Sequence, residues 1–245
     1  MSVPRKIDTP IRVRFEECRP GGEIRASAFL RYAQDAAWVH SDLAGFDRAW
    51  YLQRGLTWVV RCLTLDVLGP SLAGTSLTVT TEVLGMRRIL ARRHAEIVDT
   101  AGGLIATVDT DWLLTGPGFV PVRIPPDFED AFPAVPSTFE PARVPLPSTP
   151  PGAHLRSFHV RRSEIDPMAH VNNAAYVDYL EESLAEAGAV AALDARPRRY
   201  ALEYQQAAEP GAELHGATWR DIDGWSYRLT DAAGADLLRA RFSGG

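Results

Sequence analysis

Apolar residues recur every three or four positions in two stretches of the chain, and each stretch predicts an amphipathic helix. The first runs over residues 29–43 and is followed by Gly45, and the second runs over residues 176–187 and is followed by Gly188. This spacing places the apolar side chains on one helical face, and glycine commonly follows the end of a helix. We therefore expect one long, mostly buried helix near the start of each half of the chain.

Runs of alternating apolar and polar residues follow each predicted helix and indicate β-strands. They cover residues 77–83, 89–98 and 104–114 in the first half and residues 225–230 and 236–242 in the second. Turns rich in Asp and Gly separate neighbouring runs, which is typical of antiparallel hairpins. One buried helix followed by an antiparallel sheet is an α+β layout.

The two halves are related by an internal repeat. A shift of 147 positions aligns Val13, Arg14, Glu17, Pro20, Ala28 and Tyr32 with identical residues at Val160, Arg161, Glu164, Pro167, Ala175 and Tyr179. Farther on, Asp99-Thr-Ala-Gly102 recurs as Asp231-Ala-Ala-Gly234, now 132 positions away. A repeat of this length indicates a duplicated domain and not a solenoid.

Proline marks the boundary between the two copies. Eleven of the 18 prolines lie between residues 117 and 151, and proline fixes φ and lacks an amide donor. We therefore predict an extended linker over 117–153, between an N-terminal domain (1–116) and a C-terminal domain (154–245). The length of 245 residues suffices for two units of about 100–120 residues each.

Composition and charge narrow the class of protein. A hydrophobic content of 46% and a charged content of 23% are those of an ordinary globular protein, and no apolar run approaches the ~20 residues of a membrane span. The net charge of −5 argues against nucleic-acid binding. With only two cysteines, we expect no disulfide framework. The six histidines lack the spacing of a metal site, so we expect no metal and no other cofactor. The N-terminus lacks a signal-peptide pattern, so we expect a cytoplasmic protein.

The repeat preserves packing residues but loses a set of polar ones. Asp166, His170, Asn172 and Asn173 of the second copy face Arg19, Glu23, Arg25 and Ala26 of the first. Chemistry that occurs once in a duplicated chain predicts a single active site, in the second half.

The polar set lies in a recognisable motif. The segment from Ser163 to Tyr176, with Asp166-Pro-Met-Ala-His170-Val-Asn172-Asn173 at its centre, resembles the signature of acyl-ACP thioesterases. Leu202-Glu203-Tyr204, Trp58-Val59-Val60 and Gly85-Met86-Arg87-Arg88 resemble further segments of that family, in the same order. The resemblance implies a double hotdog fold, in which two antiparallel sheets each wrap a long helix and pack as an intrachain pseudo-dimer. It also implies hydrolysis of acyl-ACP to free fatty acid, in fatty acid biosynthesis and lipid metabolism.

The chain departs from the family pattern at three positions. Met168 stands where the family has Asn, and Ala207 and Ala208 stand where it has its catalytic Glu and adjacent Cys. Glu209 lies two residues beyond the expected Glu, so a small shift could bring it near the site. Asp without these partners also resembles the minimal pattern of simpler hotdog thioesterases.

The remaining residues can support thioester hydrolysis. Asp166 could activate water or attack the carbonyl directly, and the backbone amides at the helix start could stabilise the oxyanion. His170 could hydrogen-bond the carbonyl or the acid, and Asn172 could position water. Asn173 and Tyr176 are the candidate substrate-binding residues. Helix capping is the structural alternative for Asn172 and Asn173, and core packing is the alternative for Tyr176. A turn or capping role is likewise the alternative for Asp166.

Other functions and partners stay open. The rivals are an acyl-CoA thioesterase of the same fold and a non-catalytic acyl-thioester-binding protein. A hotdog dehydratase is set aside because the Asp and His of the dehydratase motif are five positions apart, whereas Asp166 and His170 are four apart. Arg87, Arg88, Arg92 and Arg93 could contact acidic acyl carrier protein or the phosphates of coenzyme A, or simply line a solvated strand face. A homodimer is a further possibility.

Overall fold

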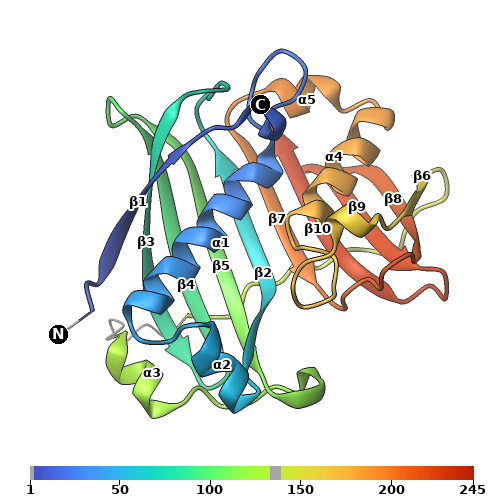
Figure 1. Cartoon of the computed structure of the whole chain (residues 1–245). Helices are drawn as coiled ribbons and strands as arrows, with labels where there is room; N and C mark the ends of the chain where they lie inside the picture. Colours follow the sequence, from blue (N-terminus) through green and yellow to red (C-terminus); the bar gives the residue numbers. More distant parts are fainter. Residues whose placement is uncertain (1–2, 133–138) are drawn as a thin grey trace. The chain divides into compact units, whose positions relative to one another are not determined.

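The computed structural model describes residues 3–132 and 139–245, which belong to two compact units (Figure 1). The first unit comprises residues 1–63 and 69–142, and the second comprises residues 64–68 and 143–245. The chain thus passes from one unit to the other at residue 143, inside the segment predicted as a linker.

In the first unit, a long helix packs on a sheet of strand order β1-β3-β4-β5-β2 (Figure 1). Its elements are β1 (Lys6–Arg12), the short 3-10 turn η1 (Phe15–Glu17), α1 (Ala26–Leu43), α2 (Arg48–Arg54), β2 (Thr57–Val67), β3 (Ser76–Arg87), β4 (Leu90–Asp99) and β5 (Leu104–Thr115). The β1–β3, β3–β4 and β4–β5 pairs are antiparallel. Helix α1 packs against β1, β3, β4 and β5.

The second unit repeats this plan with strand order β7-β10-β9-β8-β6. Its elements are β6 (His154–His159), η3 (Arg162–Glu164), α4 (Ala175–Glu186), α5 (Val190–Asp194), β7 (Arg198–Tyr204), β8 (Glu213–Asp221), β9 (Gly224–Asp231) and β10 (Asp236–Gly244). All four strand pairs are antiparallel, and α4 packs against β6 and β8. Each unit is one helix on one antiparallel sheet, as the periodicity predicts.

Burial explains why these residues form these elements. On α1, Ala28, Phe29 and Ala36 are fully buried, and on α4 the same holds for Val177 and Leu180. The predicted helices at 29–43 and 176–187 are therefore confirmed as α1 and α4. The five predicted strand runs correspond to β3, β4, β5, β9 and β10.

The internal repeat is visible in individual hydrogen bonds. In the β4–β5 turn, Asp99 Oδ1 accepts from the amides of Ala101 (2.9 Å) and Gly103 (2.8 Å). In the β9–β10 turn, Asp231 Oδ1 accepts from Ala233 (3.0 Å) and Ala235 (2.8 Å) in the same way. The 132-residue offset thus relates two structurally equivalent hairpins.

The predicted linker is more ordered than its proline content suggests. It begins with the 3-10 turn η2 (Pro117–Phe119) and contains a helix, α3 (Pro126–Ala131), so the prediction of no helix is wrong there. Proline is compatible with the first helical position because the amide it lacks would be unbonded anyway. The Phe128 ring of α3 lies 4.7 Å from Phe46 and 4.8 Å from Phe132. Pro133 and Pro136 of this linker lie outside the described residues.

Candidate active site

Asp166 lies in a tight turn just before α4. The Asp166 amide donates to the His170 carbonyl (2.8 Å) and the Ala169 amide donates to the Asp166 carbonyl (3.0 Å). Ala169 has a positive φ of 62°, which closes the turn at some steric cost. The turn brings the backbones of Asp166 and His170 next to each other.

The Asp166 carboxylate is oriented by the same turn. Its Oδ1 accepts from the amides of Met168 (2.8 Å) and His170 (3.4 Å). Within residues 3–132 and 139–245, no hydrogen bond reaches Oδ2. One oxygen thus has the turn-forming role that is the structural alternative, while the other remains available to solvent or substrate, since Asp166 is only half-buried.

The amides at the start of α4 are partly used within the protein. Asn172 Oδ1 accepts from the Ala174 amide (3.0 Å), and the Asn172 carbonyl accepts from Ala175 (2.9 Å). Asn172 therefore forms a local turn just before α4, whose N-cap residue is Ala174. The amides of Asn173 and Tyr176 donate to no acceptor in the described part of the chain, so these two are the candidate oxyanion donors.

Tyr176 connects α4 to the segment after β7. Its side chain is 1% exposed, and its hydroxyl oxygen accepts from the Ala208 amide (2.9 Å). Burial raises the pKa of Tyr176 to about 12; the Ala208 amide opposes this rise and the charge of Asp166 adds to it. The phenol is therefore neutral and fixed. Tyr204 packs edge-on against it (5.5 Å between centroids) and donates to the Asn173 carbonyl (2.9 Å).

The equivalent turn of the first unit has the same backbone hydrogen bonds but different polar side chains. The Arg19 amide donates to the Glu23 carbonyl (2.8 Å), as Asp166 does to His170. Glu17 accepts from the Tyr32 hydroxyl, and Glu164 accepts from Tyr179. In place of the acid and the histidine, Arg19 and Glu23 form an ion pair at 2.6 Å. In the first turn, the side chains at the positions of Asp166 and His170 thus bind each other. This agrees with the expectation of a single site, which stays a prediction.

The positions that differ from the family pattern lie close by but add no catalytic group. Met168 and Ala207 are exposed, and Ala208 is buried with its amide bound to Tyr176. Glu209 is exposed, and its carbonyl accepts from Ala212 (3.1 Å). The structure records no contact that brings the Glu209 side chain to Asp166.

The predicted arginine contacts with a carrier are wrong for two of the four residues. Arg93 is buried against His40 (2.9 Å), and Arg92 pairs with buried Asp111 through two bonds of 2.6 and 2.8 Å. Arg87 pairs with Glu140 (3.4 Å), and only Arg87 and Arg88 are exposed. The alternation of the sequence alone could not reveal that Arg93 is buried or that Arg92 pairs with a buried acid on the neighbouring strand.

Within residues 3–132 and 139–245, no cluster of three or more His, Cys, Asp or Glu side chains is arranged to hold a metal ion. Among the helices in that part of the chain, none combines the length and apolar character of a membrane span.

Comparison with protein families identifies both halves. The acyl-ACP thioesterase N-terminal domain matches residues 4–128, and the acyl-ACP thioesterase C-terminal domain matches residues 151–240. No curated protein matches the sequence closely enough to count as a relative.

Solved structures share the fold over nearly the whole chain. A protein provisionally assigned as an oleoyl thioesterase from Lactobacillus plantarum has a TM-score of 0.84 at 19% identity, covering 98% of this chain and 96% of its own. An acyl-ACP thioesterase from Bacteroides thetaiotaomicron has a TM-score of 0.80 at 17% identity, covering 98% and 97%. The 12:0-ACP thioesterase from Umbellularia californica has a TM-score of 0.80 at 18% identity, with the same coverage. At these identities the likeness establishes the fold, a double hotdog.

Proposed function

Because this chain belongs to the acyl-ACP thioesterase family, and is thus a thioester hydrolase that releases free fatty acid from acyl-ACP, we propose that Asp166 is its catalytic carboxylate. The observation that carries the proposal is the pair of equivalent turns. Both turns have the same backbone hydrogen bonds, but the second has a carboxylate, Asp166, at the position where the first has Arg19. A purely structural turn does not need the acid, since Arg19 occupies the same place in the first copy.

In the proposed mechanism, Asp166 Oδ2 accepts a proton from a water molecule while Oδ1 stays bound to the Met168 amide. The resulting hydroxide attacks the thioester carbonyl carbon, and the carbon–sulfur bond then breaks to give the acid and a thiolate that takes up the proton. Direct attack by Oδ2 would give an acyl anhydride instead. Single turnover in ¹⁸O-labelled water detects the anhydride route when the anhydride is hydrolysed at the Asp166 carboxyl carbon, because the product then carries the unlabelled Asp166 oxygen, which direct attack by water never gives.

The other predicted residues act around this carboxylate. The Asn173 and Tyr176 amides at the positive end of α4 stabilise the oxyanion. His170 hydrogen-bonds the carbonyl or the acid, and the Asn172 side-chain NH₂ group positions water because its oxygen is engaged by Ala174. The Tyr176 ring and Asn173 border the bound thioester, with Tyr176 held in place by Ala208.

The test is the substitution Asp166→Asn, which keeps an Oδ1 acceptor for the Met168 amide. We expect kcat/KM for acyl-ACP to fall at least ~100-fold, the contribution typical of a general base, with little change in thermal unfolding. Glu209→Gln is the matched control and should retain full activity, since that acid is exposed. Retention of wild-type turnover by Asp166→Asn would refute the assignment, and loss of turnover in Glu209→Gln would move it to Glu209.

The cellular compartment, the pathway, the substrate preference and the oligomeric state are also proposals. We place the enzyme in the cytoplasm, in fatty acid biosynthesis, and the buried thiols of Cys18 and Cys62, which form no disulfide, suit a reducing compartment. Acyl-ACP is the preferred substrate over acyl-CoA, and a homodimer is compatible with the fold. Turnover of acyl-ACP and acyl-CoA at matched chain lengths tests the preference, and sedimentation tests the oligomeric state.

A further inference from the structure

Two exposed arginines, Arg161 and Arg162, lie directly before the turn that carries Asp166. The Ile165 amide donates to the Arg162 carbonyl (3.4 Å), and Ile165 pairs with Val171 on the other side of the turn. Arg162 and Asp166 are four residues apart, and even a fully extended chain of that length spans only about 14 Å. The two arginines therefore lie beside the proposed site, in the same unit.

Neither arginine forms an ion pair within the described residues. Glu164, the acid closest to them in sequence, accepts from the Arg161 amide (2.7 Å) and from the Tyr179 hydroxyl (2.6 Å) through Oε2. Glu213 lies in the same region because it pairs in register with His159, but in that part of the chain no ion pair joins it to either arginine. Other arginines of the unit do pair with acids: Arg143, Arg156, Arg199, Arg228, Arg239 and Arg241. Exposed guanidinium groups without such a pair are available to the acids of another molecule.

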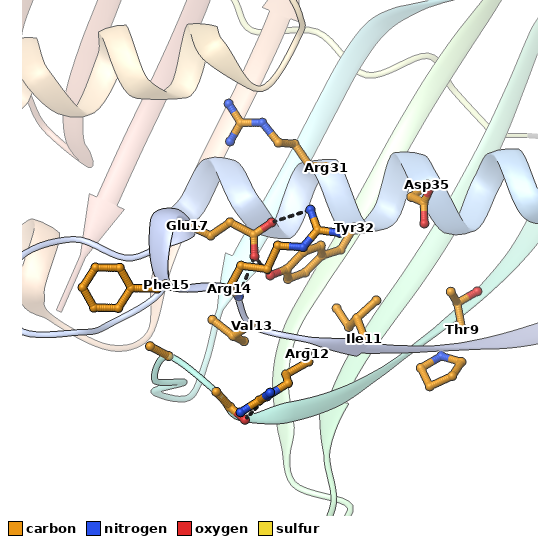
Figure 2. A pocket seen from close by; sticks show the side chains of 13 residues that line it. Thr9, Ile11, Arg12, Val13, Arg14, Phe15, Glu17, Arg31, Tyr32 and Asp35 are labelled. Atoms are coloured by element: carbon orange, nitrogen blue, oxygen red, sulfur yellow. Dashed lines mark hydrogen bonds and ion pairs between the residues drawn. The ribbon is translucent and has the colours of Figure 1, made fainter.

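The first unit has only one arginine at the equivalent positions, where Arg14 and Phe15 stand in place of Arg161 and Arg162. Figure 2 shows Arg14 beside Glu17, with Nη1 4.0 Å from Oε1, and Phe15 apart from both. Phe15 is 87% exposed and Arg162 is exposed too, so core packing does not determine which residue stands there. The pair of arginines is thus specific to the second copy.

We infer that Arg161 and Arg162 form the docking contact for the acyl carrier protein, an acidic partner that must lie against the surface around Asp166 to deliver its thioester. The inference rests on the proposed function, because it takes acyl-ACP as the substrate and Asp166 as the catalytic group. Opposite charges at the rim of an interface mainly raise the rate of association, and exposed charges act over a Debye length of about 8 Å at physiological ionic strength. The arginines should therefore favour a thioester on the carrier protein over the same thioester on a small thiol.

The variant Arg161→Ala/Arg162→Ala tests the docking contact. We expect kcat/KM for acyl-ACP to fall roughly five- to tenfold, mainly through KM, since each exposed pair contributes modestly. Hydrolysis of the N-acetylcysteamine thioester of the same acid, which has neither carrier nor phosphate, should stay unchanged. Arg220→Ala is the matched control and should change neither substrate. Arg220 is exposed in the same unit but lies seven residues along β8 from Glu213, a distance of about 23 Å.

Two measurements test whether charge is what matters. Arg161→Lys/Arg162→Lys should keep at least about half of the wild-type kcat/KM for acyl-ACP, because docking over a rim needs the charge more than the guanidinium geometry. Added sodium chloride should lower kcat/KM for acyl-ACP less in the alanine variant than in the wild type. An unchanged KM for acyl-ACP in the alanine variant, or an equal loss in Arg220→Ala, would overturn the inference.

Other substrates separate docking from the remaining roles of the two arginines. An equal loss with the N-acetylcysteamine thioester would assign them to the turn itself, and an equal loss with acyl-phosphopantetheine would assign them to the phosphate of the arm; both results would refute docking. Asp166→Asn should instead lower turnover of every substrate. An active Asp166→Asn variant, together with a carrier-selective loss in the arginine variant, would refute the catalytic assignment and support the docking contact.

Discussion

Two histidines of the first unit have pKa values shifted in opposite directions. His40 on α1 is buried; burial and then the charge of Arg93 lower its pKa, against a bond to the Pro4 carbonyl. His94 on β4 bonds to Asp109 (2.8 Å), which raises its pKa. Folding therefore disfavours the protonated form of His40 and favours that of His94.

These shifts predict opposite contributions to stability at acidic pH. Below the unfolded histidine pKa of about 6.5, the unfolded chain protonates His40 more readily than the folded one, so stability is lost as pH falls. His94 stabilises the folded state below about 6.5, and that stabilisation is lost as pH rises through its folded pKa. In urea unfolding from pH 8 to 5, His40→Gln should flatten the loss of unfolding free energy on acidification, and His94→Gln should steepen it. Identical slopes for both variants and the wild type would contradict the assignment.

At the scale of elements, the repeat and the periodicity made much of the fold predictable from the sequence. Helical periodicity located α1 and α4, and comparison of Asp166 with Arg19 led to the candidate site, which stays a prediction. Helix α3 was missed because proline content was read as uniformly helix-breaking. The buried pairing of Arg93 with His40 was missed because it joins residues 53 positions apart, which no local pattern signals.

The segment after residue 139 is held by buried acids, which the proline content also did not signal. Asp111 accepts from the Ala142 amide (2.8 Å) in the first unit. In the second, Glu203 accepts from the Val144 amide (2.9 Å) and from Arg143 (2.9 Å). Each acid thus fixes an otherwise extended chain to a strand.

Glu203→Met, which removes both carboxylate oxygens, should therefore destabilise the second unit. Glu203 and Val144 are both buried, and a buried donor left without an acceptor costs about 1–3 kcal/mol. We expect a loss of that size in the free energy of unfolding and faster proteolysis near residue 144. Asp66→Asn is the control, because Asp66 pairs with a largely exposed Arg199 at 3.1 Å, and surface pairs contribute about 0–1 kcal/mol. Equal losses in the two variants would show that Glu203 does not hold the segment.

On the scale of the whole molecule, the two copies share a structural turn but differ in its side chains. Both copies retain the turn, with Glu17 or Glu164 accepting from a helix tyrosine, so this contact has the same structural role in each unit. Only one copy retains the acid. The Arg19–Glu23 pair of the other, with a quarter or less of each side chain exposed, closes the place where a second site would be.

The double substitution Arg19→Ala/Glu23→Ala should thus leave hydrolysis intact. Because both members of the pair are removed together, we expect only a small loss in unfolding free energy, with kcat and KM for acyl-ACP unchanged. Asp166→Asn, in the equivalent turn, should remove turnover while sparing stability. A fall in kcat in the Arg19→Ala/Glu23→Ala variant would mean that both turns serve the reaction and that the chain does not contain a single site.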